Sequence, residues 1–367
     1  MTLRRYHPRR AHLHGWVIAL GFAAMVIAIL PVAAVLITGV PGDGHRTAFA
    51  AAPPGSYVVV ATSGDDHDII AIAGVEDADF REEILRVDRL PGFASTGAVS
   101  PDGRLLALVV VDGGTLKRPE ASLILVDLET ADVRSLIPDI DPLQRPVWRP
   151  DSAGVVAVRS AAGASGTTVT VIEAPVDGSE PETLLSASAV LGVYPVGFDR
   201  DGALVSVRID GKGSTVLRGA EPIAHLTEFI TRDWSLSPDG SQLAFIVVDQ
   251  SAGLRYVPSV VSLDKDSAVV AAQSAGSATE ALGTAWAPGA RSATFGVEPG
   301  SGGAASAQAA AGFDVPLEYS PEGDALAVRH WTGTSFDQPG SANLEVVTGN
   351  GRVTLDGASR FFGWAKR

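Results

Sequence analysis

The apolar residues of this chain follow two different patterns. Residues 16–40 form one uncharged apolar run, WVIALGFAAMVIAILPVAAVLITGV. From residue 57 onward, the pattern changes to short runs rich in Val, Ile and Leu that are bounded by Gly, Pro and Asp. Short runs of that composition are typical of β-strands. We therefore expect one long helix near the N-terminus, followed by an all-β domain.

The first run is long enough to cross a membrane. About 20 apolar residues span a bilayer as an α-helix, and this run has 25. Residues 1–15 precede it and hold four arginines and no acid. Positive residues favour the cytoplasmic side of a membrane helix. We therefore expect a basic cytoplasmic tail over residues 1–15, a transmembrane helix over 16–40, and the rest of the chain outside the cytoplasm at the cell membrane.

The segment between the helix and the β-rich part is expected to be a linker over residues 41–56. It lacks periodicity and contains Pro53-Pro54, which favours irregular structure. Within it, Ala48-Phe49-Ala50 resembles a signal-peptidase cleavage site, so a cleaved signal peptide is the alternative. The apolar run is longer than the core of a usual signal peptide, and polar residues 41–46 separate it from this site. Both features favour a retained signal anchor.

A short motif recurs in the β-rich part: an apolar or aromatic residue, any residue, then Pro-Asp-Gly or a variant of it. Its members are Pro101, Asp102, Gly103, Pro150, Asp151, Asp201, Gly202, Pro238, Asp239, Gly240, Pro321, Glu322 and Gly323. Proline presets φ at the first corner of a tight turn, aspartate bonds to nearby backbone, and glycine takes a positive φ. Strand-like runs follow the copies, as at Leu105–Val109 and Leu243–Ile246. The motif therefore predicts a structural turn between two strands, repeated along the chain.

The spacing of the motif matches the blade of a β-propeller. The position two residues before the proline, or its equivalent, is occupied by Val99, Trp148, Phe198, Leu236, Trp286, Tyr319 and Trp364. Successive positions lie 33 to 50 residues apart, which is the length of four short strands with their turns. We expect the recurring aromatic side chains to pack between neighbouring blades.

The two ends of the β-rich part complement each other. No strands follow the last copy, Phe362–Ala365, whereas Tyr57–Val60, Asp68–Ala73 and Ile84–Val87 resemble a blade that lacks its first strand. Joining the ends would close the ring and remove its exposed edges. This predicts a propeller over residues 57–367 with seven blades, or six if residues 300–312, which contain few strand-forming residues, are only a loop.

The Ser-Pro-Asp-Gly copies, followed by runs such as Leu-Ala-Leu at 106–108 and Leu-Ala-Phe at 243–245, resemble the repeats of the TolB-type, WD40-like bacterial propellers. The resemblance covers residues 57–367 and implies the propeller fold. In TolB the propeller follows a separate periplasmic domain and binds a lipoprotein of the envelope. This sequence has a predicted membrane helix in place of that domain, so the resemblance does not carry the partner over.

Charge and composition restrict the function further. Beyond residue 15, 24 Lys and Arg stand against 42 Asp and Glu, a net charge of −18. An acidic surface repels nucleic acid and anionic lipid, so no nucleic-acid partner is expected, and a neutral or basic partner is favoured. The chain contains no cysteine, which excludes disulfides, thiolate catalysis and cysteine-based zinc sites.

No catalytic or cofactor-binding residue is assigned from the sequence, because no nucleophile elbow, phosphate loop or zinc motif is present. Asp65, Asp66 and Asp68 are the only metal-ligand candidates, with a solvated hairpin turn as the alternative. His330 could act as a general base if it reached the channel. We therefore expect a binding module of the bacterial cell envelope whose partner is a protein or an envelope polymer, without a cofactor. The alternative is a propeller hydrolase, of the lactonase or glycan-cleaving kind, with a metal in the central channel.

Overall fold

The structure is a computed structural model that describes residues 47–77, 79–163, 166–188, 190–264, 269–271, 280–299 and 311–367. The basic tail expected over residues 1–15 and the transmembrane helix expected over 16–40 lie outside these residues. In the part of the chain that is described, no helix is long and apolar enough to cross a membrane.

Strands dominate the described residues, which also contain a short 3-10 helix, η1 (Ala48–Ala51). The first half of the ring contains β1 (Ser56–Ser63), β2 (His67–Gly74), β3 (Arg81–Asp88), β4 (Thr96–Val99), β5 (Leu105–Thr115), β6 (Arg118–Asp127), β7 (Val133–Ile137), β8 (Val147–Trp148), β9 (Gly154–Gly163), β10 (Gly166–Pro175), β11 (Glu182–Ser188), β12 (Gly192–Phe198) and β13 (Leu204–Asp210). The second half contains β14 (Gly213–Arg218), β15 (Glu221–Thr227), β16 (Ile230–Leu236), β17 (Gln242–Asp249), β18 (Arg255–Ser262), β19 (Val269–Ala271), β20 (Ala281–Ala285), β21 (Thr294–Val297), β22 (Phe313–Tyr319), β23 (Ala325–Trp331), β24 (Ala342–Thr348), β25 (Gly351–Thr354) and β26 (Arg360–Lys366).

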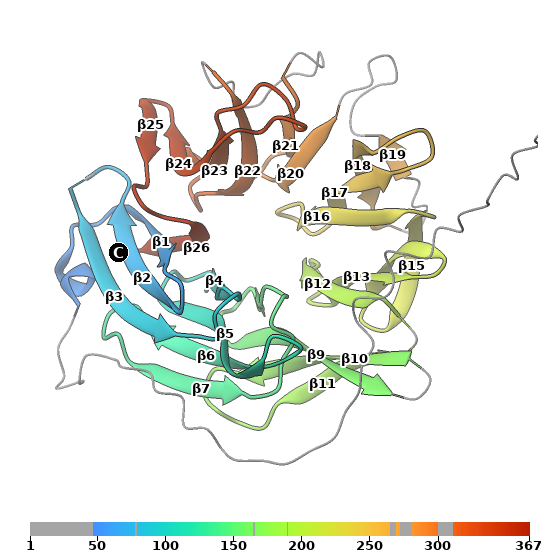
Figure 1. Ribbon diagram of the computed structural model, residues 1–367, viewed down its shortest axis with the longest axis horizontal. Helices are drawn as coiled ribbons and strands as arrows, with labels where there is room; N and C mark the ends of the chain where they lie inside the picture. The colour runs from blue at the N-terminus through green and yellow to red at the C-terminus, as the bar shows by residue number, and fades with distance from the viewer. Residues whose placement is uncertain are drawn as a thin grey trace, which may run out of the picture.

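These strands form a β-propeller, as the sequence predicts (Figure 1). Six blades are four-stranded antiparallel sheets, and a two-stranded sheet, β20–β21, stands in the ring between the β16–β19 and β22–β25 blades. Six complete blades are therefore described, and the two-stranded sheet occupies the position in which the sequence favours a further blade.

The two ends of the chain close the ring, which confirms that prediction. Strand β26 pairs with β1, and the order of this sheet is β26-β1-β2-β3. Val58 lies opposite Trp364 in the pairing. At the start of β26, the Ser359 hydroxyl donates to the Ala61 carbonyl at 3.1 Å. The last strand of the chain is thus the innermost strand of the blade that the first strand begins.

Successive side chains along a strand point to opposite faces of its sheet and fill the spaces between neighbouring blades. In β5, Leu106 and Leu108 pack against the closing blade, whereas Ala107 and Val109 pack toward the β8–β11 blade. All four are almost fully buried. Each blade therefore contributes two apolar faces, and removal of one leucine side chain from water stabilises such a seam by about 1.5–3 kcal/mol.

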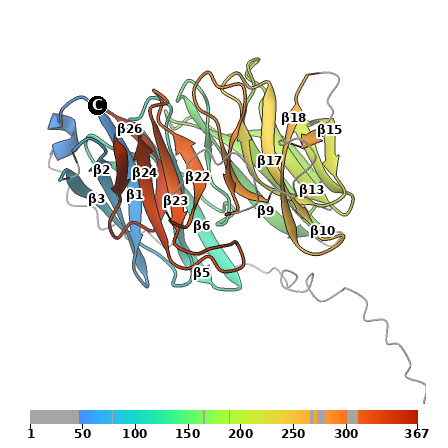
Figure 2. The ribbon, with the colours of Figure 1, turned by 90° about the horizontal axis from the view of Figure 1, so that it is seen from above.

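The turns of the blades alternate between the two faces of the ring. In every blade except the closing one, the innermost strand comes first in sequence. The Pro-Asp-Gly turns that follow the innermost strands therefore lie on one face, which we call the turn face. The opposite face carries the second-to-third-strand hairpins and the loops that enter each innermost strand; we call it the mouth face. Figure 2 shows η1 and the C-terminus at one face and the end of the β5–β6 hairpin at the other.

Part of the expected linker is folded onto the ring. The Phe49 side chain is 1% exposed and lies 5.1 Å from the Tyr57 ring. The backbone N–H of Phe49 donates to Glu82 at 2.8 Å, and Thr47 donates from its hydroxyl to the Glu129 carbonyl at 3.0 Å. From Thr47 onward, the segment expected to be a linker over residues 41–56 is thus docked on the ring, because Phe49 fills an apolar pocket between two blades.

Candidate functional site

The central channel of the ring contains a cavity that could hold a ligand. It encloses a cavity of about 880 Å³ whose lining residues come from all seven sheets. Aromatic side chains form part of the wall: Tyr194, Trp234, Trp331 and Phe361. Tyr194 and Trp234 stack with their ring centres 4.9 Å apart. An apolar wall with a few polar groups is the usual composition of a ligand site.

Bulges in the innermost strands shape this wall. The pairing register shifts at Val196 in β12, at Asp233 and Trp234 in β16, at Gly283 in β20 and at Leu317 in β22. Each of these residues lines the cavity. A bulge leaves an extra residue outside the ladder and re-aims the local side chains. The same irregularity thus recurs in neighbouring blades where they meet the channel.

One arginine ties three innermost strands together. Arg145 lies in the loop before β8 and donates to the Gly97 carbonyl at 3.0 Å and to the Phe362 carbonyl at 3.0 Å. Its Nη2 also forms an ion pair with Glu318 Oε2 at 3.1 Å. Both side chains remain almost half exposed, so solvent weakens the pair. Arg145 is therefore engaged by neighbours from three blades.

A second ion pair is built on a strained residue. Asp233 has φ 54°, a left-handed conformation that residues other than glycine rarely adopt. Its carboxylate forms an ion pair with Arg232 at 3.1 Å and accepts from the Gly283 N–H at 2.9 Å. These contacts connect β16 to β20 and offset the backbone strain, which costs on the order of 1–3 kcal/mol.

Arg329 differs from the other charged residues of the channel. It lies on β23 and lines the cavity, and its side chain has no hydrogen bond or ion pair with any other described residue. Burial lowers the pKa of Arg329, and the nearby Arg360 guanidinium lowers it further. The channel therefore holds one partly buried positive charge without a counter-ion in the described part of the chain.

The repeated motif forms the turns. The N–H groups of Gly103, Gly202, Gly240 and Gly323 donate to the carbonyl three residues earlier at 2.8–3.0 Å, and all four glycines have positive φ. Hydrogen bonds from the Ser237 hydroxyl, then from the Ser241 N–H and hydroxyl, lower the pKa of Asp239 to about 2. In the variant copy at Pro150-Asp151, the glycine position is taken by Ser152 at φ 58°.

The turns also pack against one another around the ring. A Cβ on Gly240 would stand 2.7 Å from the Cα of Asp199, in the turn of the preceding blade. One on Gly103 would stand 2.5 Å from the backbone nitrogen of Lys366. The glycine therefore serves two purposes: it allows the left-handed conformation, and it leaves room for the preceding blade.

The recurring aromatic residues lie between blades. Trp148 and Trp286 are 7% and 8% exposed. The indole N–H of Trp148 donates to the Ala98 carbonyl of the preceding blade at 2.7 Å, and that of Trp286 donates to the Ser235 carbonyl at 3.2 Å. Their role is to join blades, as the sequence predicts.

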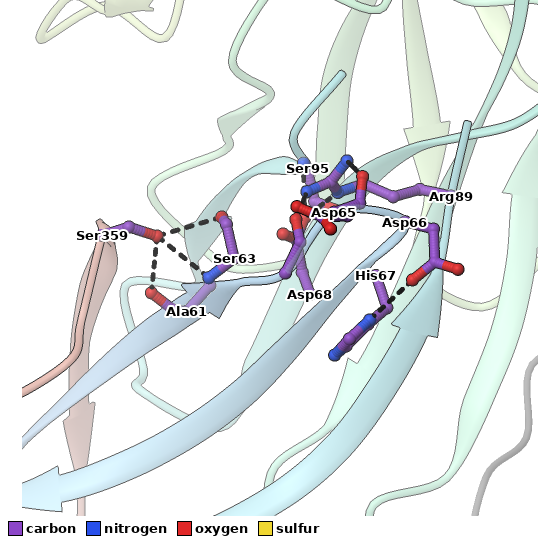
Figure 3. A network of polar contacts seen from close by, with 10 residues as sticks. Ala61, Ser63, Asp65, Asp66, His67, Asp68, Arg89, Ser95 and Ser359 are labelled. Atoms are coloured by element: carbon purple, nitrogen blue, oxygen red, sulfur yellow. Dashed lines mark hydrogen bonds and ion pairs between the residues drawn. The ribbon is translucent and has the colours of Figure 1, made fainter. Parts of the chain in front are cut away.

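The three metal-ligand candidates do not converge (Figure 3). The Asp68 carboxylate is buried and forms an ion pair with Arg89 at 3.0 Å, whereas Asp66 bonds to His67 at 2.8 Å. Asp65 contributes its backbone carbonyl to Arg89. Across the described ranges, no group of three His, Cys, Asp or Glu side chains lies close enough to hold a metal ion. An arginine thus occupies the place in which Asp68 would hold a cation.

His330 does not line the channel cavity. Its Nδ1 lies 2.9 Å from a carboxylate oxygen of Asp314, which is buried and also paired with Arg352. Arg352 in turn contacts Glu345 at 2.8 Å. The histidine therefore belongs to a polar cluster within the β22–β25 blade, and the general-base hypothesis lacks the necessary position.

The mouth face carries the exposed apolar side chains. Leu116, Leu143, Leu191, Ile230 and Leu254 are 50–70% exposed; four lie in hairpins or entry loops of that face, and Ile230 begins β16 there. The other large apolar residue exposed among those described is Val269, on an outer strand. The exposed large apolar residues of the described part are therefore concentrated on the mouth face.

No motif in the sequence marks the channel residues. A positional signal exists nonetheless. Arg145 and Asp233 each stand three residues before the leading residue of a repeat, and Glu318 stands one residue before. These leading residues end innermost strands. A charged residue just before one of them therefore lies beside the channel.

Comparison with known proteins defines the class by fold. No family model and no curated protein matches the sequence. Among solved structures, TolB from Acinetobacter baumannii is 13% identical, with a TM-score of 0.51, over 85% of this chain and 66% of that one. The acylaminoacyl peptidase of Pyrococcus horikoshii is 12% identical, with a TM-score of 0.53, over 84% of this chain and 53% of that one.

The likeness extends to a prolyl oligopeptidase from Galerina marginata, 12% identical, with a TM-score of 0.50 over 84% of this chain and 52% of that one. The chain thus spans between about half and two thirds of the length of these proteins. The chain is a β-propeller protein with a TolB-like fold. At these identities, the comparison defines the fold and leaves the function to the site.

Proposed function

We propose that this protein is a membrane-anchored, extracytoplasmic binding module that docks a protein or envelope-polymer partner on its mouth face. The observation that carries the proposal is the concentration of exposed leucine and isoleucine side chains on that face. Leu143, which is 65% exposed, also lines the cavity. Apolar anchors beside a pocket are the usual core of a protein-binding surface.

The position of the N-terminal segment supports this orientation. Thr47 bonds to the carbonyls of Leu128 and Glu129, at the turn that follows β6, which lies on the turn face. An anchor helix over residues 16–40 would therefore hold the turn face toward the membrane. The mouth face would then point away from the membrane, toward a partner.

Burial of Phe49 favours a retained anchor over cleavage at Ala50. Phe49 fills a pocket between the closing blade and the β4–β7 blade, and cleavage after Ala50 would remove it. Burial of a phenylalanine side chain is worth about 1.5–3 kcal/mol. The mature ring is therefore more stable with Thr47–Ala50 attached.

The hydrolase alternative has less support. A metal-dependent propeller hydrolase needs carboxylates that converge in the channel. The two channel acids, Asp233 and Glu318, are instead each in an ion pair with an arginine. In the described part of the channel, no carboxylate is left to activate water without breaking such a pair.

The natural absence of cysteine offers a direct test of location. Leu191→Cys and Asp151→Cys would each introduce a single thiol, on the mouth face and the turn face respectively. A membrane-impermeant maleimide should label both full-length variants in intact cells. Labelling only after lysis would refute the extracytoplasmic location. N-terminal sequencing of the mature protein distinguishes the anchor, with residues 1–50 present, from a cleaved chain that begins at Ala51.

Binding is tested with surface variants of the full chain in detergent. Leu143→Ser together with Leu191→Ser removes two exposed apolar side chains from the mouth face, and Val269→Ser is the matched control on an outer strand. Partners cross-linked in cells to the wild type and to the control should be lost or reduced at least tenfold with the double variant. Equal recovery from all three proteins would refute the docking surface.

A further inference from the structure

The charge in the channel is opposite in sign to that of the whole domain. Arg145, Arg232 and Arg329 line the cavity, against the acids Asp233 and Glu318. Both acids are already paired with arginines, at 3.1 Å in each case. The remaining charge, on Arg329, is positive, although the part of the chain beyond residue 15 carries a net charge of −18.

A second arginine increases the local positive charge. Arg360 begins β26, next to Phe361, which lines the cavity. The Arg360 side chain also has no hydrogen bond or ion pair with another residue of the described part, and its charge acts on Arg329. A partly buried arginine without a counter-ion destabilises the free protein, and a like charge that acts on it adds to this cost. An arrangement of that kind is favourable when a ligand supplies the counter-charge.

We propose that Arg329, with Arg360 adding positive charge from the start of β26, forms an oxyanion-binding subsite at the channel mouth, which takes a carboxylate or phosphate group of the ligand. A guanidinium binds such planar or tetrahedral anions through paired N–H groups. Trp331, two residues after Arg329 on β23, lines the same cavity and supplies an apolar wall beside the charge. Phe361 does the same next to Arg360.

This subsite refines the partner class expected from the sequence. The overall acidity favours a neutral or basic partner at the outer surface, whereas the channel selects an anionic group attached to an apolar or aromatic part. The inference rests on the proposed binding role of the mouth face, and it specifies which chemical group enters the channel there.

The subsite is tested with small oxyanions, so that its outcome does not depend on finding the partner. The full chain in detergent is titrated by calorimetry with inorganic phosphate, with 4-phenylbutyrate, and with 4-phenylbutyramide as the uncharged control. The aromatic carboxylate should bind, the amide should not bind, and affinity should fall as salt rises. The ratio of carboxylate to phosphate affinity identifies the group that the site prefers.

Arg329→Gln and Arg360→Gln should each weaken binding of the preferred anion at least tenfold. The matched control is Arg86→Gln, an exposed arginine on the outer strand β3, which should bind as the wild type does. Arg329→Gln should also melt at the same temperature as the wild type or above it, because the variant removes a partly buried charge without a partner. A folded Arg329→Gln protein with unchanged affinity would overturn the subsite.

The two proposals fail separately. If neither phosphate nor phenylbutyrate binds the wild type, the subsite is wrong, whatever the mouth-face variants do in cross-linking. If an anion binds through Arg329 but the Leu143 and Leu191 variants still recover every partner, the subsite holds and the docking surface is wrong.

Discussion

Phe362 offers a sharp test of how the ring is held closed. It lies on β26, is 1% exposed, and packs in the apolar cluster that joins the closing blade to the β4–β7 blade. A Cβ on Gly97 of β4 would stand only 3.2 Å from a ring carbon of Phe362, so the phenylalanine fills the space that this glycine leaves. Phe362→Ala would open a cavity at the closure of the ring.

The magnitude follows from this burial. Replacing a fully buried phenylalanine with alanine costs about 3–5 kcal/mol, including the cavity that remains. The entropy of unfolding is about 2 cal/mol/K per residue. In a domain of roughly 300 residues, each kcal/mol lost from the free energy of unfolding therefore lowers the thermal midpoint by about 1.5 °C. Phe362→Ala should therefore lower the thermal midpoint by about 5–8 °C.

The assay is thermal unfolding of the full chain in detergent, followed by circular dichroism. Leu116→Ala is the control, because Leu116 is 69% exposed and its shift should stay within about 1 °C. Removal of residues 361–367 should act in the same direction and more strongly, since it deletes most of β26 and exposes the edge of β1. A midpoint within 1 °C of the wild type for both Phe362→Ala and the truncated chain would refute closure through β26.

Three further perturbations address the turns and the N-terminal segment. Ser237→Ala removes the main cause of the low pKa of Asp239, which stands at about 2 instead of 3.8; that depressed pKa contributes stability above pH 4 that is lost as the pH falls toward 2. NMR titration should find the Asp239 pKa closer to 3.8 in the variant, and an unchanged value would contradict the hydrogen bond. Gly240→Ala should destabilise by about 1–3 kcal/mol, because of its φ of 68° and the Asp199 backbone 2.7 Å from the new Cβ; an unaltered denaturation midpoint would show that neighbouring turns do not pack. Phe49→Ala should cost about 3 kcal/mol in chemical denaturation, whereas no loss would mean that the segment is not docked.

The fold could be predicted from the sequence because the same local rule repeats. A turn that needs proline, aspartate and glycine is visible in the sequence as those three residues in that order, as at Pro238-Asp239-Gly240. The strand that follows it is visible as a short apolar run. Ring closure is also predictable, since the first three strand-like runs, which begin at Tyr57, Asp68 and Ile84, resemble a blade that lacks its innermost strand. These features are local in sequence or repeat at a fixed spacing.

The channel could not be predicted in the same way. Its wall is assembled from seven sheets, and bulges decide which side chains face inward. The ion pair between Arg145 and Glu318 joins residues 173 positions apart. The burial of Asp68 against Arg89 is also hidden in the sequence. Asp68 belongs to the polar segment 65–68, whose composition is that of an exposed hairpin turn. Contacts that depend on the closed ring leave no periodic signal.

The measurement that tests the central claim most directly is cross-linking from each face of the ring in intact cells. A photoactivatable thiol-reactive cross-linker that does not cross membranes is attached to Leu191→Cys on the mouth face and, separately, to Asp151→Cys on the turn face. The proposed binding role predicts that illumination yields a specific adduct from position 191, and none from position 151. An adduct from position 151 alone, or equal adducts from both positions, would contradict binding through the mouth face.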